Sequence, residues 1–186
     1  MAWHELTKFL RESRGTDDPA DDPRRTDALL IYNPMAGPRA ELRRDLDRVV
    51  DYLAERGWHV TMRATRKPGD ATELARAAVA ARCKAVLVAG GDGTIHEVVN
   101  GLVGSDTALG VLPAGTGNVW AKEIGLPTLT LTQPDRLLTA ARMLVDGHVR
   151  WIDVGRAGDR YFLICAGVGI DSSVAAKVEP RTRAKK

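Results

Sequence analysis

One stretch of this 186-residue chain combines a carboxylate with glycines that let a ligand come close. Residues 90–94 read Gly-Gly-Asp-Gly-Thr, so three glycines surround the side chain of Asp92. Backbone N–H groups that point out of such a turn attract phosphate. A carboxylate among them could hold a metal ion, steer a phosphate or accept a proton. Three glycines around one Asp favour a phosphate or nucleotide site over an ordinary tight turn.

The residues on either side of this glycine turn show which elements would position it. An apolar run, Ala85–Ala89, precedes it and is typical of a buried strand. Apolar residues then recur at helical spacing, namely Ile95, Val98, Val99 and Leu102. The turn therefore joins a strand to a helix. It matches neither the Gly-x-x-x-x-Gly-Lys-Ser/Thr pattern nor the dinucleotide Gly-x-Gly-x-x-Gly pattern.

The rest of the chain repeats this alternation. Strands are predicted over 28–32, 58–64, 85–89 and 108–112, with helices after Pro38, Asp70, Gly93 and Val119. Asp70 and Glu73 have the spacing of a capping box for a helix that runs to about Arg82. Alternating strands and helices indicate an α/β fold with a parallel sheet. Ligands bind at the carboxyl ends of such strands, so the loops at Asn33, Gly90 and Pro113 should gather there.

Three segments of different character divide the chain. Residues 1–27 are expected to form a flexible N-terminal segment, although Trp3, Leu6 and Phe9 could line one side of a short helix. Residues 28–148 form the predicted nucleotide-binding lobe. Residues 149–186 are expected to begin a β-rich second lobe, with antiparallel strands at Val149–Gly155 and Tyr161–Gly169, and to end in a basic tail.

Composition sets limits on the class of function. The net charge of +3 is too small to argue for nucleic-acid binding and is compatible with anionic phosphates or an anionic membrane surface. No apolar run approaches the ~20 residues that cross a bilayer, and the charged N-terminus does not resemble a signal peptide. Cys83 and Cys165 are expected to be reduced core residues of a cytoplasmic protein.

Three ordered motifs resemble the diacylglycerol kinase catalytic domain, the domain of bacterial lipid kinases, diacylglycerol kinases and sphingosine kinases. They are Asn33-Pro-Met-Ala-Gly37, Gly90-Gly-Asp-Gly-Thr-Ile-His-Glu-Val-Val-Asn-Gly101 and Leu112-Pro-Ala-Gly-Thr-Gly-Asn118. The similarity extends from about Leu29 to Val174. It implies the nucleotide-binding lobe shared with NAD kinases, which is phosphofructokinase-like, followed by a β-rich lobe.

The resemblance implies ATP-dependent phosphorylation of a lipid hydroxyl with Mg²⁺, at a membrane surface that the protein meets peripherally. Asp92 would be the catalytic residue of the glycine turn, and the metal ligands stay unassigned. A homo-oligomer is left open. The nucleotide site would be lined by Asn33, Gly37, Thr65, Gly91, Asp92, Gly93, Thr94, Glu97 and Thr116.

Two departures from the family pattern bear on activity. Ala36 stands where family members usually have Ser or Gly, and the chain contains no Asp-Gly-Glu motif, whose acidic residues are thought to supply the base for the lipid hydroxyl. We therefore expect a nucleotide-binding half without a complete catalytic site. The alternatives are an NAD kinase-like enzyme, which shares the Gly-Gly-Asp-Gly-Thr turn, and a non-catalytic nucleotide-binding module.

Two further residues, one inside a motif and one just after a motif, are expected to have no direct role in catalysis or nucleotide binding. His96 faces away from Ile95 and Val98 on the predicted helix, so we expect its imidazole to be solvated. Trp120 follows the second glycine-rich turn and lies in the next helix, so it is expected to pack against the core and not to support an adenine ring.

Overall fold

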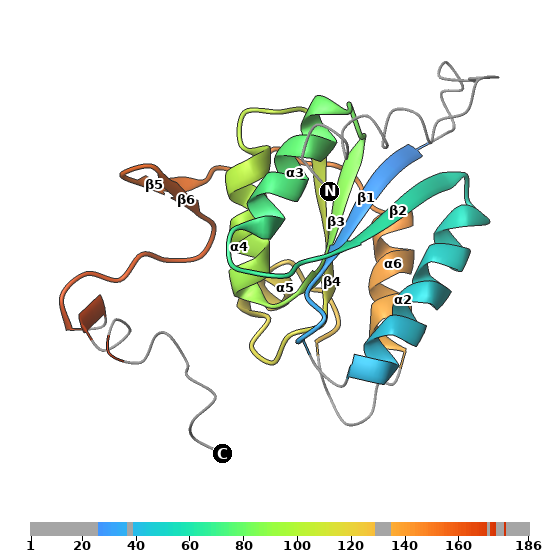
Figure 1. The fold of residues 1–186 in the computed structure, drawn as a ribbon, viewed down its shortest axis with the longest axis horizontal. Helices are drawn as coiled ribbons and strands as arrows, with labels where there is room; N and C mark the ends of the chain where they lie inside the picture. Colours follow the sequence, from blue (N-terminus) through green and yellow to red (C-terminus); the bar gives the residue numbers. More distant parts are fainter. Residues whose placement is uncertain (1–25, 37–38, 129–134, 171, 174–176, 178–186) are drawn as a thin grey trace.

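A four-stranded parallel sheet forms the centre of the protein (Figure 1). The structure is a computed structural model that describes residues 26–36, 39–128, 135–170, 172–173 and 177. The strands are β1 (Thr26–Tyr32), β2 (Trp58–Ala64), β3 (Ala85–Gly90) and β4 (Ala108–Pro113), in the order β2-β1-β3-β4. The parallel α/β fold is thereby confirmed. Residues 1–25 of the expected flexible N-terminal segment, where a short helix was a possibility, and the basic tail lie outside the described residues.

The central strands are apolar because both faces of the sheet are covered. All six residues of β3 are buried, and so are the four central residues of β1. In the register of this pair, Leu30 lies beside Leu87 and Ile31 beside Val88. Strands that are buried on both faces are expected to show continuous apolar runs in place of alternation, as these two do.

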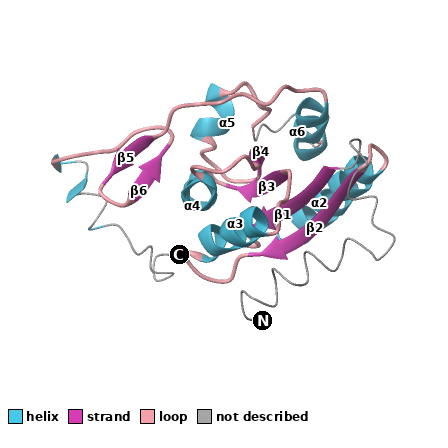
Figure 2. Cartoon of the chain, turned by 90° about the horizontal axis from the view of Figure 1, so that it is seen from above, coloured by secondary structure: helices cyan, strands magenta, loops and turns pink. Residues whose placement is uncertain are grey.

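Helices cover the sheet in two layers (Figures 1 and 2). On one face, α2 (Arg39–Ala54) packs against β2, and α6 (Arg136–Val145) packs against β4 and α2. On the other face, α3 (Asp70–Ala80) and α4 (Asp92–Leu102) pack against each other and against β1 and β3. The short helix α5 (Val119–Glu123) follows β4. The buried side of α2 is formed by Leu42, Leu46, Val49 and Leu53.

The chain changes direction between β1 and β3, and this places the site. After β1 the chain passes through α2 to the outer strand β2, and after β2 it returns through α3 on the opposite face to β3. The loops that follow β1 and β3 therefore leave the sheet toward opposite faces. In open α/β sheets this topological switch point opens a crevice at the carboxyl ends of the strands, where ligands bind.

The start of α3 differs from the predicted capping box. Gly69, with a left-handed φ of 89°, is the N-cap, and Asp70 is the first helical residue. The Asp70 carboxylate turns back to accept hydrogen bonds from the N–H groups of Arg66 and Lys67, at 2.8 and 3.1 Å. Glu73 pairs with Arg76 at 2.7 Å. The capping-box prediction is wrong because Asp70 stabilises the loop before the helix and leaves the helix N–H groups to another residue.

Helices α3 and α4 approach closely because Gly101 has no side chain. A Cβ atom at Gly101 would lie 2.6 Å from the Cβ of Ala75 and 2.6 Å from the carbonyl oxygen of Thr72. Gly in a helix interior costs about 1 kcal/mol relative to Ala. This contact between helices explains why glycine is nevertheless present.

We expect Gly101→Ala to destabilise the protein by about 1–3 kcal/mol, since the overpacking outweighs the gain in helix propensity. Denaturant unfolding measures the change. Gly93→Ala in the same helix is the control, because a Cβ atom there meets nothing within 4 Å. Equal stability of the Gly101→Ala variant and the wild type would show that the two helices are not held by this contact.

After α6 the chain forms a small antiparallel hairpin of β5 (Gly155–Ala157) and β6 (Arg160–Phe162), which lies beside α4 in Figure 1. The predicted strands Val149–Gly155 and Tyr161–Gly169 are wrong in length, because each strand has only three residues. Residues 149–154 and 163–169 have no ladder partner among the described residues. An apolar run becomes a strand only when a neighbouring strand pairs with it and another layer covers it.

Several apolar side chains in this segment are exposed. Trp151 is 84% exposed, and Val149, Ile152, Val168 and Ile170 are also exposed. Cys83 is buried as predicted, but Cys165 is exposed, so its expected place in the core is wrong. Among the described residues, no helix combines the length and the apolar character needed to cross a bilayer.

Candidate functional site

The loops at the carboxyl ends of the strands are joined by backbone hydrogen bonds. The N–H of Thr65, after β2, donates to the carbonyl of Tyr32 at 2.9 Å. The N–H of Asn33, after β1, donates to the carbonyl of Ala89 in β3 at 3.0 Å. The end of β1 and the glycine turn therefore lie side by side, as the parallel sheet predicted, and the end of β2 lies next to the end of β1.

Asn33 also shapes the loop after β1. Its side-chain oxygen accepts a hydrogen bond from the N–H of Met35 at 2.9 Å, and its carbonyl accepts one from the N–H of Ala36 at 3.0 Å. Asn favours such turns because its short side chain imitates a backbone carbonyl. Asn33 therefore orients the loop at the switch point. Gly37, the other predicted site residue of this loop, lies outside the described residues.

The two glycine-rich turns, residues 90–94 and 113–118, pack directly on each other. The N–H groups of Ala114 and Gly115 both donate to the carbonyl of Gly90 at 3.2 Å. A Cβ atom at Gly115 would lie 2.5 Å from the Cα of Gly91, so the two backbones touch. Only glycine permits this approach, and the two turns therefore form one structural unit.

Asp92 connects the two turns through its carboxylate. One oxygen accepts a hydrogen bond from the N–H of Val119 and the other from the N–H of Trp120, each at 3.1 Å. These are the first two N–H groups of α5, which have no partner inside the helix. Asp92, which belongs to α4, thus caps α5 from across the site. Trp120 is partly buried against the core, so its predicted packing role is confirmed.

Asn118 holds the second turn in shape. It is fully buried and adopts a left-handed conformation with φ 49°. Its side-chain oxygen accepts a hydrogen bond from the N–H of Gly115 at 3.1 Å, and its side-chain NH₂ donates to the carbonyl of Gly115 at 2.6 Å. Asn tolerates positive φ better than most residues. Because the side chain of Asn118 is used inside the turn, Asp92 supplies the cap for α5.

In the part of the chain that the structure describes, the packing around two glycines of the first turn does not require glycine. A Cβ atom at Gly91 would make only an ordinary contact, 3.5 Å from Gly115, and one at Gly93 would meet nothing within 4 Å. Gly91 has an extended backbone with φ −97°, which any residue adopts. Gly93 is exposed in the first turn of α4, where Ala would favour the helix. The missing side chain of Gly93 leaves open space at the surface of the turn, and that of Gly91 leaves space beside Gly115 of the second turn.

The N–H groups around this space are available to a ligand. Within the described residues, the N–H groups of Gly91, Asp92 and Gly93 donate no backbone hydrogen bond, whereas those of Thr94 and Ile95 both donate to the carbonyl of Gly91. The unpaired N–H groups at the start of an α-helix attract anions, and the helix dipole adds partial positive charge. The first turn of α4 therefore offers an anion-binding surface bordered by two glycines.

Thr94 and Thr116 differ in their surroundings. Thr94 lies over Gly90, since a Cβ atom at Gly90 would be 2.8 Å from both the Cβ and the hydroxyl oxygen of Thr94. Thr116 is exposed at the tip of the second turn. The structure thus brings Asn33, Thr65, Gly91, Asp92, Gly93, Thr94 and Thr116 to one edge of the sheet.

Glu97 faces α3. One of its carboxylate oxygens accepts a hydrogen bond from the N–H of Ala71 at 3.2 Å, in the first turn of that helix. Its backbone carbonyl accepts a hydrogen bond from the hydroxyl of Thr72 at 2.8 Å. Glu97 therefore supplies the cap that Asp70 does not. A role for Glu97 at a nucleotide stays a prediction.

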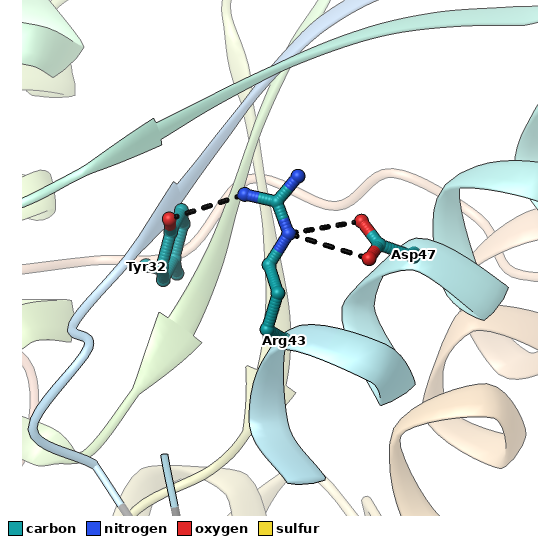
Figure 3. Close-up of polar contacts among 3 residues, drawn as sticks. All are labelled: Tyr32, Arg43 and Asp47. Atoms are coloured by element: carbon teal, nitrogen blue, oxygen red, sulfur yellow. Dashed lines mark hydrogen bonds and ion pairs between the residues drawn. The ribbon is translucent and has the colours of Figure 1, made fainter. Parts of the chain in front are cut away.

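An arginine fixes the start of α2 beside the end of β1 (Figure 3). The guanidinium of Arg43 donates to the hydroxyl of Tyr32 at 3.4 Å and to both carboxylate oxygens of Asp47 at 3.0 and 3.3 Å. The hydrogen bond to Tyr32 is the largest cause of a raised pKa of Arg43, and the charge of Asp47 adds to it. Because Tyr32 precedes Asn33, this contact supports the loop at the switch point.

His96 is only partly exposed and not fully solvated as predicted. Its Nε2 atom is shielded from water and has no hydrogen-bond partner in the described part of the chain. The residue four positions later in α4, Asn100, bonds to Tyr161 of β6, and residues four apart share one helix face. The hairpin therefore lies on the face that the sequence alone assigned to solvent.

The oxygen ligands at the glycine turn suit a metal ion that is shared with a nucleotide. No group of three metal-ligating side chains occurs within the ranges that the structure describes. A Mg²⁺ ion that arrives with a nucleotide needs only one or two carboxylates, because phosphates and water supply its other ligands. Each oxygen of Asp92 accepts a single N–H and keeps further acceptor capacity. The residues therefore fit an ion that is shared with a phosphate and not an all-protein metal site.

Comparison with known proteins identifies relatives of the chain. Residues 27–157 match the family model of the diacylglycerol kinase catalytic domain. A diacylglycerol kinase of Bacillus subtilis (strain 168) is 38% identical over 144 residues, which cover 76% of this chain and 45% of that protein. A diacylglycerol kinase of Staphylococcus carnosus is 32% identical over 158 residues, which cover 84% of this chain and 49% of that protein.

The fold is also similar to a solved structure. A diacylglycerol kinase from Bacillus anthracis superposes with a TM-score of 0.64 at 31% identity, covering 83% of this chain and 51% of that one. The chain thus spans about half the length of the curated relatives that it matches.

Proposed function

Because the chain belongs to the diacylglycerol kinase catalytic domain family, we propose that it binds Mg·ATP at the glycine turn. The reaction that this lobe serves is phosphoryl transfer from ATP to a lipid hydroxyl at a membrane surface. Within the described ranges, the packing does not require glycine at positions 91 and 93, and this observation carries the proposal. The space that they leave, beside unpaired N–H groups, suits a phosphate chain.

The residues of the site have separate tasks in this proposal. The N–H groups of Gly91, Asp92 and Gly93 bind phosphate oxygens, and the neighbouring turn, held by Asn118, presents Thr116 to the nucleotide. Asn33 and Thr65 border the same edge. Phosphoryl transfer depends mainly on such positioning and on neutralisation of charge. Mg²⁺, when bound with the nucleotide, neutralises phosphate charge, and Asp92 is the carboxylate that would hold it.

The 186 residues provide fewer of the groups needed to activate the lipid hydroxyl than of the groups needed to bind the nucleotide. The Asp-Gly-Glu motif, from which the family resemblance would draw a base for the lipid hydroxyl, is absent from the sequence. We therefore propose that these 186 residues bind Mg·ATP well and transfer phosphate slowly. Residues 149–186 are proposed to belong to the second lobe that would carry the lipid site.

The test combines nucleotide binding with a transfer assay. The protein is incubated with Mg·ATP labelled at the γ-phosphate, with mixed micelles that contain diacylglycerol, and in parallel with NAD as the acceptor. We expect label in the lipid fraction and none in the NAD fraction. Matched incubations without protein and with Asp92→Asn show whether the label is transferred by this site.

Each outcome has a defined meaning. Label in phosphatidic acid supports the full proposal, and binding of Mg·ATP without transfer supports a nucleotide-binding half. Label transferred to NAD would overturn the lipid-kinase interpretation in favour of an NAD kinase-like enzyme. A folded protein that binds no nucleotide would contradict the proposal altogether.

A further inference from the structure

The side chain of Asn100 makes hydrogen bonds that the proposed function does not use. Its side-chain oxygen accepts from the N–H of Tyr161 at 2.9 Å, and its NH₂ donates to the carbonyl of the same residue at 2.9 Å. The NH₂ also donates to the carbonyl of His96 at 2.8 Å, within α4. Both side-chain atoms that can hydrogen-bond are therefore engaged.

This pair of bonds imitates the pairing of two strands. β6 pairs with β5 on one edge, where Tyr161 lies opposite Arg156. The N–H and the carbonyl of Tyr161 point the other way, toward α4, which lies beside β6 in Figure 2. A strand edge that is left unpaired exposes such groups. The amide of Asn100 supplies one donor and one acceptor in one plane, as a neighbouring peptide would.

We propose that Asn100 is a positioning residue, which holds the β5–β6 hairpin on the helix that begins at the glycine turn. Asp92 lies at the first residue of α4 and Asn100 near its end, about 12 Å along the axis. The helix is rigid over this length because it is packed against α3 and β3. A ligand at the glycine turn and the β5–β6 hairpin are thereby connected through one element.

The bonds between Asn100 and Tyr161 lie in partly buried surroundings, where the loss of a partner matters. Tyr161 and Leu163 pack against the core, and the Nε2 atom of His96 is shielded from water one helical turn before Asn100. A backbone polar group that loses its partner in such a place is costly. A carboxylate at position 100 could accept from the N–H of Tyr161 but would face two carbonyl oxygens without a proton to donate.

The first experiment measures amide hydrogen exchange without ligand. In Asn100→Ala we expect the Tyr161 amide to exchange about tenfold faster or more. Asn100→Asp should also speed its exchange. Ala favours helices more than Asn does, so the amides of Val98 and Val99 should stay protected. The matched control is Arg156→Ala, which removes a guanidinium that lies 5.7 Å from the Tyr161 ring but leaves the bonds to Asn100. Unchanged exchange of Tyr161 in Asn100→Ala would overturn the proposal.

The second experiment adds Mg·ATP and rests on the proposed function. In the wild type, the nucleotide should slow exchange at residues 92–95 and also at Tyr161. In Asn100→Ala it should slow exchange at residues 92–95 only, a difference that a merely stabilising contact would not produce. Protection of the turn without protection of Tyr161 in the wild type would overturn the coupling. Failure of the nucleotide to bind would instead overturn the proposed function, while the ligand-free comparison still decides the role of Asn100.

Discussion

Asp92→Asn is expected to lower Mg·ATP affinity at least about tenfold and to lower any lipid phosphorylation by about 10²-fold or more. The substitution removes the negative charge proposed to meet Mg²⁺. It also leaves one acceptor where two are used, so either Val119 or Trp120 loses the partner of its N–H. We therefore expect a loss of about 1–2 kcal/mol in unfolding free energy as well. Calorimetric titration and denaturant unfolding measure the two effects.

The control for Asp92→Asn is Asp106→Asn, which removes the same charge from an exposed residue at the opposite end of the sheet, before β4. It should bind Mg·ATP as the wild type does. If Asp92→Asn also bound and phosphorylated normally, Asp92 would be a helix cap only. The site would then depend on backbone N–H groups alone.

Gly115→Ala is expected to abolish nucleotide binding and to destabilise the protein by about 2–3 kcal/mol. The added Cβ atom would lie 2.5 Å from the Cα of Gly91, 3.0 Å from its nitrogen and 2.9 Å from the side-chain oxygen of Asn118. The first two neighbours are backbone atoms, which cannot move aside as a flexible side chain would. The two glycine turns must therefore separate, and the site is lost with them.

The stability of Gly115→Ala is compared with that of a substitution on the other side of the same contact. Gly91→Ala introduces a Cβ atom into the same contact, but at an ordinary 3.5 Å from the Cα of Gly115. Unfolding by denaturant should therefore distinguish the two variants clearly. If Gly115→Ala were as stable as Gly91→Ala, the close packing of the two turns would not exist in solution.

The alternation of strands and helices could be predicted because it depends on local patterns. The predicted first and last residues of β2 match the structure, and those of β1, β3 and β4 differ from it by at most two residues. The boundaries could be predicted because each apolar run is bounded by glycine, proline or polar residues. The carboxyl edge of the sheet could be inferred from the parallel order. It correctly brought the loops at Asn33 and Pro113 beside the glycine turn.

The contacts that hold the site together could not be predicted, because they join residues far apart in the sequence. Asp92 meets Val119 across 27 positions, and Asn100 meets Tyr161 across 61. The sequence motifs contain Asn100, Gly115 and Asn118, but the motifs alone did not indicate a role for any of these residues. The one available signal was an Asn after Thr-Gly in a turn, where positive φ is tolerated.

The wrong predictions share a physical cause. His96 was expected in solvent because the helix period alone cannot show that a hairpin lies on that face. The strands of the hairpin were predicted too long because the apolar content of residues 149–154 and 163–169 does not reveal whether a partner strand is present. Asp70 has the spacing of a helix cap, but competing backbone N–H groups in the preceding loop bind its carboxylate.

Calorimetric titration of Mg·ATP into the 186-residue protein and into its Gly91→Ala variant is the decisive test of a nucleotide site at the glycine turn. We expect one binding site in the wild type and at least about tenfold weaker binding in the variant, because the added methyl group crowds the close approach of the phosphate chain. Thermal stability should be equal, since the methyl group makes only an ordinary contact of 3.5 Å with the Cα of Gly115. Equal affinity of the two folded proteins, or no binding by the wild type, would contradict a nucleotide site at this turn.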